Sequence, residues 1–140
     1  MNNHSWHIFC WNIRGFNAQE KWDVVREKIE ESACSVLCLQ ETKKEHVDIS
    51  FIRKFAPRRF DSYDFIPSNG ASGGILVVWI DSVSQGFTID KTSFGLTISF
   101  TSRHNADVWK LTTVYGPCNE PERSNFISWF RDHIIADTDN

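Results

Sequence analysis

The chain has 140 residues, a formal net charge of −3, and 41% hydrophobic and 24% charged residues. These proportions are typical of one globular domain with a hydrophobic core, and the six Trp and eleven Phe residues argue against disorder. The slight acidity excludes a strongly basic nucleic-acid-binding surface over the whole chain, although it leaves room for a local basic patch. No apolar run approaches the ~20 residues of a membrane span, and no secretory signal is visible, which predicts a nuclear or cytoplasmic protein without a membrane partner.

The first half of the chain predicts two strands joined by one helix, followed by a shorter helix. Residues 6–12 and 35–40 are apolar runs of strand length. Between them, Asn17 is a candidate N-cap with Glu20 three positions later, which is the spacing of a capping box. Apolar residues then recur at helical spacing, and the charged residues between them, Lys21 included, are expected to face solvent. Residues 47–56 predict a short helix with the side chains of Phe51 and Phe55 on one side.

The second half predicts further strands, at 75–80, 94–102 and 108–116, and residues 86–91 alternate loosely. Short connections with turn residues favour antiparallel pairing of these strands. One face of strand 94–102 carries Leu96, Ile98 and Phe100. One face of strand 108–116 carries Trp109, Leu111, Thr113 and Tyr115.

A helix is expected after Pro121, because apolar residues again recur at helical spacing. Its apolar stripe consists of Phe126, Ile127, Phe130 and Ile134. No repeat or linker divides the sequence, so residues 1–140 are expected to form one α/β unit with a mixed sheet.

The four cysteines form neither a CxxC pair nor a paired zinc-ligand spacing. Three of them lie in apolar, strand-like runs. Buried, reduced thiols are therefore expected, as in a protein of a reducing compartment. The four are Cys10, Cys34, Cys38 and Cys118.

Two polar side chains, Asn12 and Glu41, follow the first two predicted strands directly. A strand, a crossover helix and a second strand usually form a right-handed parallel pair, so both side chains should meet at one edge of the sheet. One carboxylate and one amide suit Mg²⁺, with Mn²⁺ as its substitute, because Mg²⁺ takes few protein carboxylates and completes its shell with water and phosphate. The alternative is a solvated glutamate at the end of a strand, and the spacing alone does not separate the two interpretations.

Two further side chains are candidates for contacts with a phosphate. Arg14 lies in a loop bounded by glycine, and the phenol of Tyr115 ends its strand before Gly116 and Pro117. Ordinary turn chemistry for Arg14 and packing for Tyr115 are the alternatives. The adjacent pair Asp132-His133 is not a candidate acid-base pair, because neighbours in a helix point in different directions.

Four motifs occur in order along the chain: WNIRG (11–15), LQET (39–42), SGGILVVW (72–79) and VYGP (114–117). This ordered set resembles the endonuclease/exonuclease/phosphatase superfamily. It is most similar to the N-terminal endonuclease domain of plant LINE-type (non-LTR) retroelements. The resemblance implies an α/β (α+β) chain that forms the N-terminal half of a four-layer αββα sandwich, with each half of the chain contributing one of the two sheets.

The resemblance also implies roles for individual residues. Asn12 would contact the scissile phosphate and support the metal, Glu41 would bind Mg²⁺, and Tyr115 would touch the phosphate. The implied activity is Mg²⁺-dependent phosphodiester hydrolysis, with DNA as the partner. A Gly-Asp-Phe-Asn-like motif and a Ser-Asp-His-like motif of the family have no counterpart before the end of the sequence at ADTDN (136–140). The chain is therefore expected to be a truncated domain with little or no activity.

Two other interpretations remain open at this stage. The chain could be a retroelement-derived fragment without catalysis that binds a partner or self-associates, with Leu96, Ile98 and Phe100 as an exposed apolar sheet face. A phosphatase of the same fold is the other alternative, because a fold alone does not determine the substrate.

Overall fold

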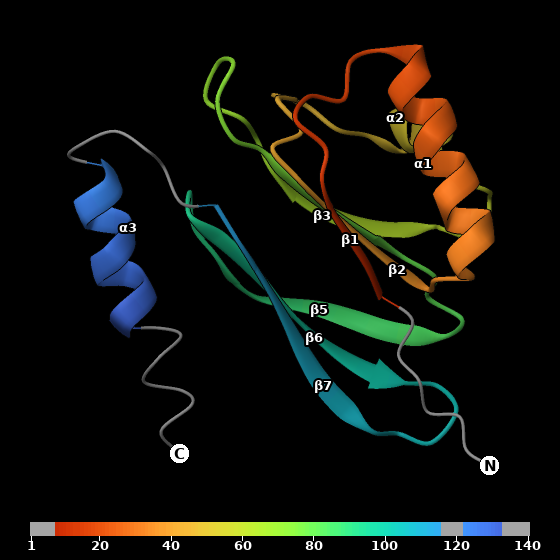
Figure 1. Ribbon diagram of the computed structural model, residues 1–140. Coiled ribbons are helices and arrows are strands. Elements are labelled where there is room, and N and C mark those ends of the chain that lie inside the picture. The colour runs from red at the N-terminus through yellow and green to blue at the C-terminus, as the bar shows by residue number, and fades with distance from the viewer. Residues whose placement is uncertain (1–7, 116–121, 133–140) are drawn as a thin grey trace.

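Two β-sheets lie face to face, and two helices cover the outer side of the first sheet (Figure 1). The structure is a computed structural model that describes residues 8–115 and 122–132. Its elements in chain order are β1 (Ile8–Asn12), α1 (Gln19–Ser32), β2 (Val36–Gln40), α2 (Ile49–Ile52), β3 (Ser62–Ile66), β4 (Ile75–Trp79), β5 (Ser84–Lys91), β6 (Gly95–Ser102), β7 (Val108–Val114) and α3 (Glu122–Phe130).

The first sheet is mixed and has the strand order β1-β2-β4-β3. β1 runs parallel to β2, while β4 pairs antiparallel with both β2 and β3. Helix α1 makes the crossover between the two parallel strands, as the sequence predicts. Asn12 lies opposite Gln40 in this register, so the carboxyl ends of β1 and β2 meet at one edge of the sheet.

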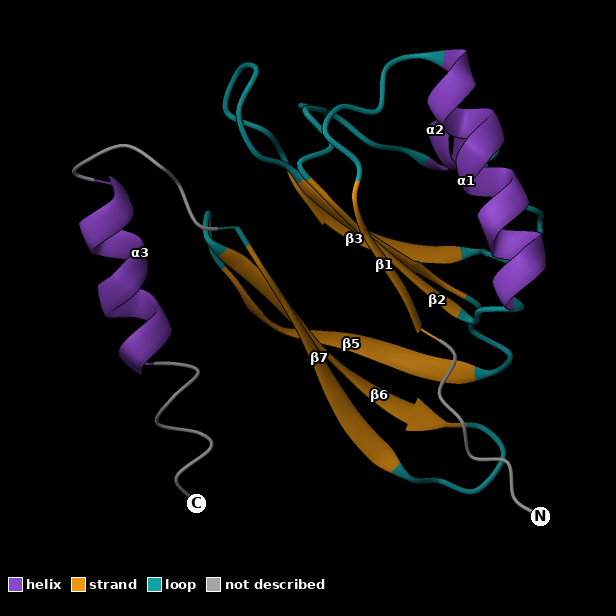
Figure 2. Cartoon of the chain, viewed as in Figure 1, coloured by secondary structure: helices purple, strands orange, loops and turns teal. Residues whose placement is uncertain are grey.

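The second sheet has the order β5-β6-β7 and is antiparallel throughout, as predicted from its short connections (Figure 2). The boundary between the sheets differs from the expectation of one sheet for each half of the chain. β4 belongs to the second half of the sequence, yet it completes the first sheet between β2 and β3. Its five residues are all buried, which requires that both of its faces be covered.

β2 contributes to two hydrophobic cores by alternation of its side chains. Leu37 and Leu39 face the helices, whereas Val36 and Cys38 face the second sheet. The helix-side core is completed by Val25, Ile29, Phe51, Ile52, Phe55, Phe60, Leu76 and Val78, with other residues around them. The sheet-side core is completed by Ile66, Ile75, Val77, Trp79, Leu96, Ile98 and Phe100.

The prediction of an exposed apolar face at Leu96, Ile98 and Phe100 is wrong. All three side chains have 0% exposure, because they pack against the first sheet in the sheet-side core. Self-association through these residues would require the two sheets to separate. The outer face of the second sheet instead carries Phe87 and Val108, which are 56% and 65% exposed.

Helix α1 begins one residue later than predicted, and its N-cap is Ala18, which makes no side-chain capping bond. The capping box at Asn17 and Glu20 is therefore wrong. Asn17 Oδ1 instead accepts a hydrogen bond of 3.1 Å from Lys44 Nζ, so this side chain is committed to the loop after β2. Glu20 still lies in the first turn, where a negative charge is favourable next to the helix N-terminus.

Helix α2 is shorter than the predicted segment 47–56, although Phe51 and Phe55 are both buried as expected. Asp48 caps it, with Oδ1 accepting a hydrogen bond of 2.9 Å from the Phe51 amide. Strand β3 was not predicted at all. Its alternation is concealed by Asp64, a charged residue on the face that points toward the second sheet.

Asp64 is tolerated there because β5 supplies its partners. Thr88 Oγ1 donates to Asp64 Oδ2 at 2.5 Å, and Lys91 Nζ donates to Asp64 Oδ1 at 2.7 Å. Partial burial opposes ionisation of this carboxyl, but the bonds from Lys91 and Thr88 outweigh it and lower its pKa. The carboxylate thus connects β3 of the first sheet to β5 of the second.

The cysteines described by the structure are free, as predicted, but they differ in exposure. Cys34 and Cys38 are buried, whereas Cys10 is exposed because β1 is the edge strand of its sheet. The expectation of burial is therefore wrong for Cys10. A hydrogen bond with Cys38 lowers the pKa of the Cys10 thiol to about 7, and the same contact together with burial raises that of Cys38. Cys118 lies outside the described residues.

Helix α3 begins at Glu122, directly after the predicted start. Trp129 makes its contact with the second sheet, at a ring-centroid distance of 6.1 Å from Phe94. The predicted apolar stripe is wrong at Ile127, which is 43% exposed. Ile134 and the side chain of Phe126 lie outside the described part of the chain. Within that part, no helix has the length and apolar character needed to cross a membrane.

Candidate functional site

Asn12 and Glu41 meet at the carboxyl ends of β1 and β2. Asn12 Nδ2 donates a hydrogen bond of 2.5 Å to Glu41 Oε2, although the residues are 29 positions apart in the sequence. Asn12 is exposed and Glu41 is half-buried, so this pair is accessible to solvent at the ends of two paired strands. The predicted juxtaposition is confirmed, while the roles assigned to the two residues stay predictions.

The loops that follow β1 and β2 run side by side beyond the end of the sheet. The Gly15 amide donates to the Glu41 carbonyl at 2.7 Å, and the Phe16 amide donates to the Thr42 carbonyl at 2.9 Å. Phe16 has 0% exposure and anchors its loop in the helix-side core. These backbone bonds fix the separation of Asn12 and Glu41 independently of their own contact.

Lys21 holds the loop after β1 from the side of α1. Its Nζ donates to the carbonyl of Ile13, and it lies 3.4 Å from the carbonyl oxygen of Arg14 and 3.3 Å from that of Gly15. The sequence pattern placed Lys21 on the solvent face of the helix, and this prediction is wrong. No local sequence signal indicates these contacts, because they depend on the path of the loop after β1 in the folded chain.

Three non-glycine residues at this edge have left-handed backbone conformations. The φ angles are 55° for Arg14, 56° for Glu41 and 56° for Lys43. Such a conformation costs an L-residue roughly 1–2 kcal/mol. The described chain contains only two other non-glycine residues of this kind, so backbone strain is concentrated where the candidate side chains lie.

Gly73 and Gly74 of the third motif close against the loop that carries Glu41. The Lys43 amide donates to the Gly73 carbonyl at 2.9 Å, and the Thr42 amide donates to the Gly74 carbonyl at 3.1 Å. A Cβ atom on Gly74 would lie 2.3 Å from Thr42 Oγ1, and its φ of 96° disfavours any side chain. The motif therefore requires glycine here for the approach of two backbones.

Tyr115 reaches the same edge by packing on Gly73. A Cβ atom on Gly73 would lie 3.4 Å from Tyr115 Cε2, and the Tyr115 amide donates to the Phe94 carbonyl at 2.7 Å. The ring is half-buried against the sheet-side core. Tyr115 of the fourth motif therefore contacts Gly73, and the carbonyl of Gly73 accepts a hydrogen bond from the loop that carries Glu41.

The other candidates lie outside this arrangement or at its rim. The Arg14 side chain is exposed, which leaves its guanidinium accessible to an anion. Asp132 is also exposed, and His133 lies outside the described residues. His46 Nε2 is 3.5 Å from Asp48 Oδ2, a surface contact that the sequence did not predict.

The described side chains contain no cluster of three or more His, Cys, Asp or Glu residues that could enclose a metal ion. A closed zinc-type site is therefore not formed by this part of the chain. One carboxylate held by one amide remains, which matches a hard cation that keeps water and phosphate ligands.

The fold is similar to that of two AP endonucleases of known structure. AP endonuclease LMAP from Leishmania major superposes with a TM-score of 0.60 and 18% sequence identity, over 94% of this chain and 45% of that protein. The catalytic domain of APE2 from Xenopus laevis superposes with a TM-score of 0.51 and 18% identity, over 87% of this chain and 48% of that domain. The chain has part of the endonuclease/exonuclease/phosphatase fold. This confirms the predicted fold class.

The likeness to these endonuclease/exonuclease/phosphatase proteins concerns the fold, and the chain spans about half of their length. No protein-family model matches the sequence, and the comparison with curated proteins found no match. In this fold, the motif residues Asn12, Glu41 and Gly73 gather at one edge of the first sheet, with Tyr115 beside them.

Proposed function

We propose that the edge formed by Asn12 and Glu41 is part of a Mg²⁺-dependent phosphodiesterase site that acts on DNA, of the type found in LINE retroelement endonucleases. The hydrogen bond between Asn12 Nδ2 and Glu41 Oε2 carries this proposal, because it presents one oriented carboxylate at a sheet edge. The likeness to two AP endonucleases supports DNA as the substrate.

The donor set at this edge fits Mg²⁺. Asn12 engages Glu41 Oε2, and among the described residues Glu41 Oε1 has no hydrogen-bond partner, so it is available to a cation. Mg²⁺ is usually bound through one or two carboxylates and retains several waters, and Mn²⁺ prefers the same ligands. When bound, the metal would polarise the phosphate and stabilise negative charge on its oxygens.

The remaining residues act on the substrate phosphate. Asn12 keeps the Glu41 carboxylate in one orientation and presents its amide to the scissile phosphate. The Tyr115 phenol donates a hydrogen bond to a phosphate oxygen, and the Arg14 guanidinium supplies positive charge. The Arg14 side chain is exposed and that of Glu41 is half-buried, so both are accessible to a substrate.

We further propose that the 140-residue polypeptide by itself has weak or no activity. The described residues offer one carboxylate at the metal site and no general base beside it. A missing general base alone costs about 10²–10⁴ in rate. Residues supplied by a longer chain or by another polypeptide would then be needed for efficient cleavage.

Metal binding and cleavage test the proposal separately. In the purified chain, Mn²⁺ should broaden the NMR signals of residues near Glu41, and the Glu41→Gln variant should lose this effect. Glu45→Gln is the matched control, because Glu45 is an exposed carboxylate in the same loop and should leave the broadening unchanged.

Nicking of supercoiled plasmid with Mg²⁺, with an EDTA control, should be barely measurable. Broadening that persists in Glu41→Gln would refute the metal site. Rapid nicking that depends on both Mg²⁺ and Glu41 would refute the low activity.

A further inference from the structure

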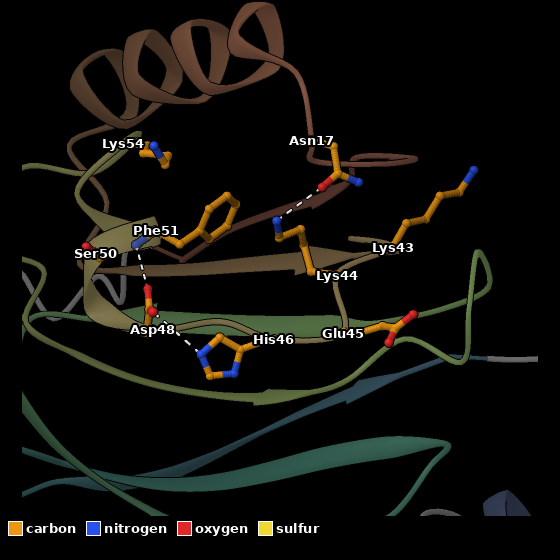
Figure 3. A pocket seen from close by; sticks show the side chains of 9 residues that line it. All are labelled: Asn17, Lys43, Lys44, Glu45, His46, Asp48, Ser50, Phe51 and Lys54. Atoms are coloured by element: carbon orange, nitrogen blue, oxygen red, sulfur yellow. Dashed lines mark hydrogen bonds and ion pairs between the residues drawn. The ribbon is translucent and has the colours of Figure 1, made fainter.

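An open cleft of about 550 Å³ lies between the loop after β2 and helix α2 (Figure 3). One wall is the loop after β2, which contributes Lys43 and Lys44 two and three residues beyond Glu41. Asn17 comes from the loop after β1, and Phe51 and Lys54 come from α2 and the turn behind it. The cleft therefore continues from the loops that hold the candidate site.

The three lysines of this cleft keep their charge unneutralised. Within the described residues, Lys43, Lys44 and Lys54 form no ion pair with a carboxylate. Two lysines elsewhere in the described structure do pair with carboxylates: Lys28 Nζ lies 3.5 Å from Glu31 Oε1, and Lys91 Nζ lies 2.7 Å from Asp64 Oδ1. Positive charge is thus concentrated in one concave region of a chain whose formal net charge is −3.

Neutral groups hold two of these ammonium groups in position. Lys44 Nζ donates to Asn17 Oδ1 at 3.1 Å and lies 4.4 Å from the centroid of the Phe51 ring. Lys54 Nζ lies 5.1 Å from the centroid of the Trp22 ring. Contacts with an amide oxygen or an aromatic face restrict the side chain without cancelling its charge.

Two acidic residues, Glu45 and Asp48, line the same cleft, so its three lysines leave it with a formal charge of +1. Asp48 accepts the Phe51 amide as the cap of α2 and lies 3.5 Å from His46 Nε2. The amide bond is the main reason that the pKa of Asp48 is lowered, so this carboxylate is ionised and directed toward the start of α2 without pairing with a lysine. The Glu45 side chain points away from Lys44 (Figure 3).

We propose that this cleft binds the phosphodiester backbone of DNA, at a phosphate that flanks the one positioned by Asn12 and Glu41. The inference rests on the proposed function and extends it to a second contact with the same strand. A phosphate suits the cleft better than a base does, because the Phe51 ring is 7% exposed and Lys44 covers its face. Lysine ammonium groups contact phosphate oxygens as point charges without reading sequence.

The test measures DNA affinity in EDTA, so that no metal contributes. The probe is a fluorescent duplex of about 20 base pairs, and its anisotropy is followed at several salt concentrations. The double variant Lys44→Gln and Lys54→Gln should weaken binding about tenfold and reduce the slope of log K against log[salt] by about 2, since each lost phosphate contact removes about 0.9. Lys43→Gln, at an exposed position, should reduce the slope by about 1 without affecting the fold.

The matched control is Lys28→Gln with Lys110→Gln, which removes the same net charge away from the cleft and should leave affinity and slope nearly unchanged. Equal losses in the two double variants, or no duplex binding by the unaltered chain at low salt, would overturn the inference. Binding of inorganic phosphate without binding of the duplex would also overturn it.

The two proposals fail separately. If Mn²⁺ still broadens signals near Glu41 but the lysine variants bind DNA normally, only the cleft is misassigned. If the lysine variants lose DNA affinity but Glu41→Gln leaves Mn²⁺ binding intact, DNA binding by the cleft is supported and metal binding by Glu41 is refuted.

Discussion

The two sheets of this molecule differ in how completely they are covered. The first sheet has helices on one face and the second sheet on the other, and β4 has no exposed residue. The second sheet buries its inner face against the first sheet, while Phe87 on its outer face is 56% exposed. Asn12 and Glu41 lie at the edge of the doubly covered sheet. Strands fixed on both faces can hold polar groups to the accuracy that a binding site needs.

The largest expected effect distinguishes the two faces of the second sheet. Phe100→Ala should lower the free energy of unfolding by about 3–5 kcal/mol, because this buried ring touches both sheets and would leave a cavity. Phe87→Ala should change it by less than about 0.5 kcal/mol, because the ring is largely in solvent. Urea unfolding measures both changes in stability. Similar losses of stability in the two variants would contradict the difference in burial between the two faces.

A smaller effect is expected at the edge of the first sheet. Gly70 and Gly74 both have positive φ, but a Cβ atom meets open space at Gly70 and the Thr42 side chain at Gly74. Gly70→Ala should cost about 1–2 kcal/mol for the backbone alone. Gly74→Ala should cost about 1–3 kcal/mol more for the overlap, and it should displace the loop of Glu41. Equal melting temperatures for the two variants would indicate that the Thr42 side chain moves away from the added methyl group at no cost in stability.

The smallest effect concerns the contacts of Asp64 with Thr88 and Lys91, which connect the two sheets. Its folded-state pKa is lowered, so the carboxylate stabilises the fold at pH values above the unfolded pKa of about 3.9. This contribution is lost as the pH falls through the lower folded-state pKa. Because the group is partly exposed, we expect less than about 1 kcal/mol.

Asp64→Asn should therefore be less stable than the unaltered chain at neutral pH. The difference should shrink in acid as the native carboxyl becomes protonated. Chemical denaturation at a series of pH values measures it, and a difference that does not depend on pH would exclude the ion pair as its source.

Much of the first sheet could be predicted from the sequence, because its signals are local. The apolar runs that end at Asn12 and Gln40, and the helix between them, specify a parallel pair. That topology alone brings Asn12 to Glu41. The antiparallel second sheet follows equally from short turns and alternation.

The rest depends on tertiary partners that local patterns do not contain. β3 could not be recognised because Asp64 interrupts its apolar face, and its partners Thr88 and Lys91 lie more than twenty residues away. Asn17 and Glu20 have the spacing of a capping box, yet Asn17 Oδ1 accepts a hydrogen bond from Lys44 Nζ and does not cap α1. The left-handed conformations at the site also escaped prediction, because they occur at residues other than glycine.

The aromatic contacts between the two sheets provide a spectroscopic signal of how the sheets are packed. Trp79 of β4 meets Phe100 at a centroid distance of 5.3 Å and an angle of 90°, and Phe100 stacks on Trp109 of β7 at 4.5 Å. Gly86 permits this arrangement, since a Cβ atom there would lie 2.7 Å from the Trp79 ring. Indole and phenyl rings in such fixed, asymmetric surroundings give near-ultraviolet circular dichroism. Separation of the two layers would therefore be visible in the spectrum without any attached dye.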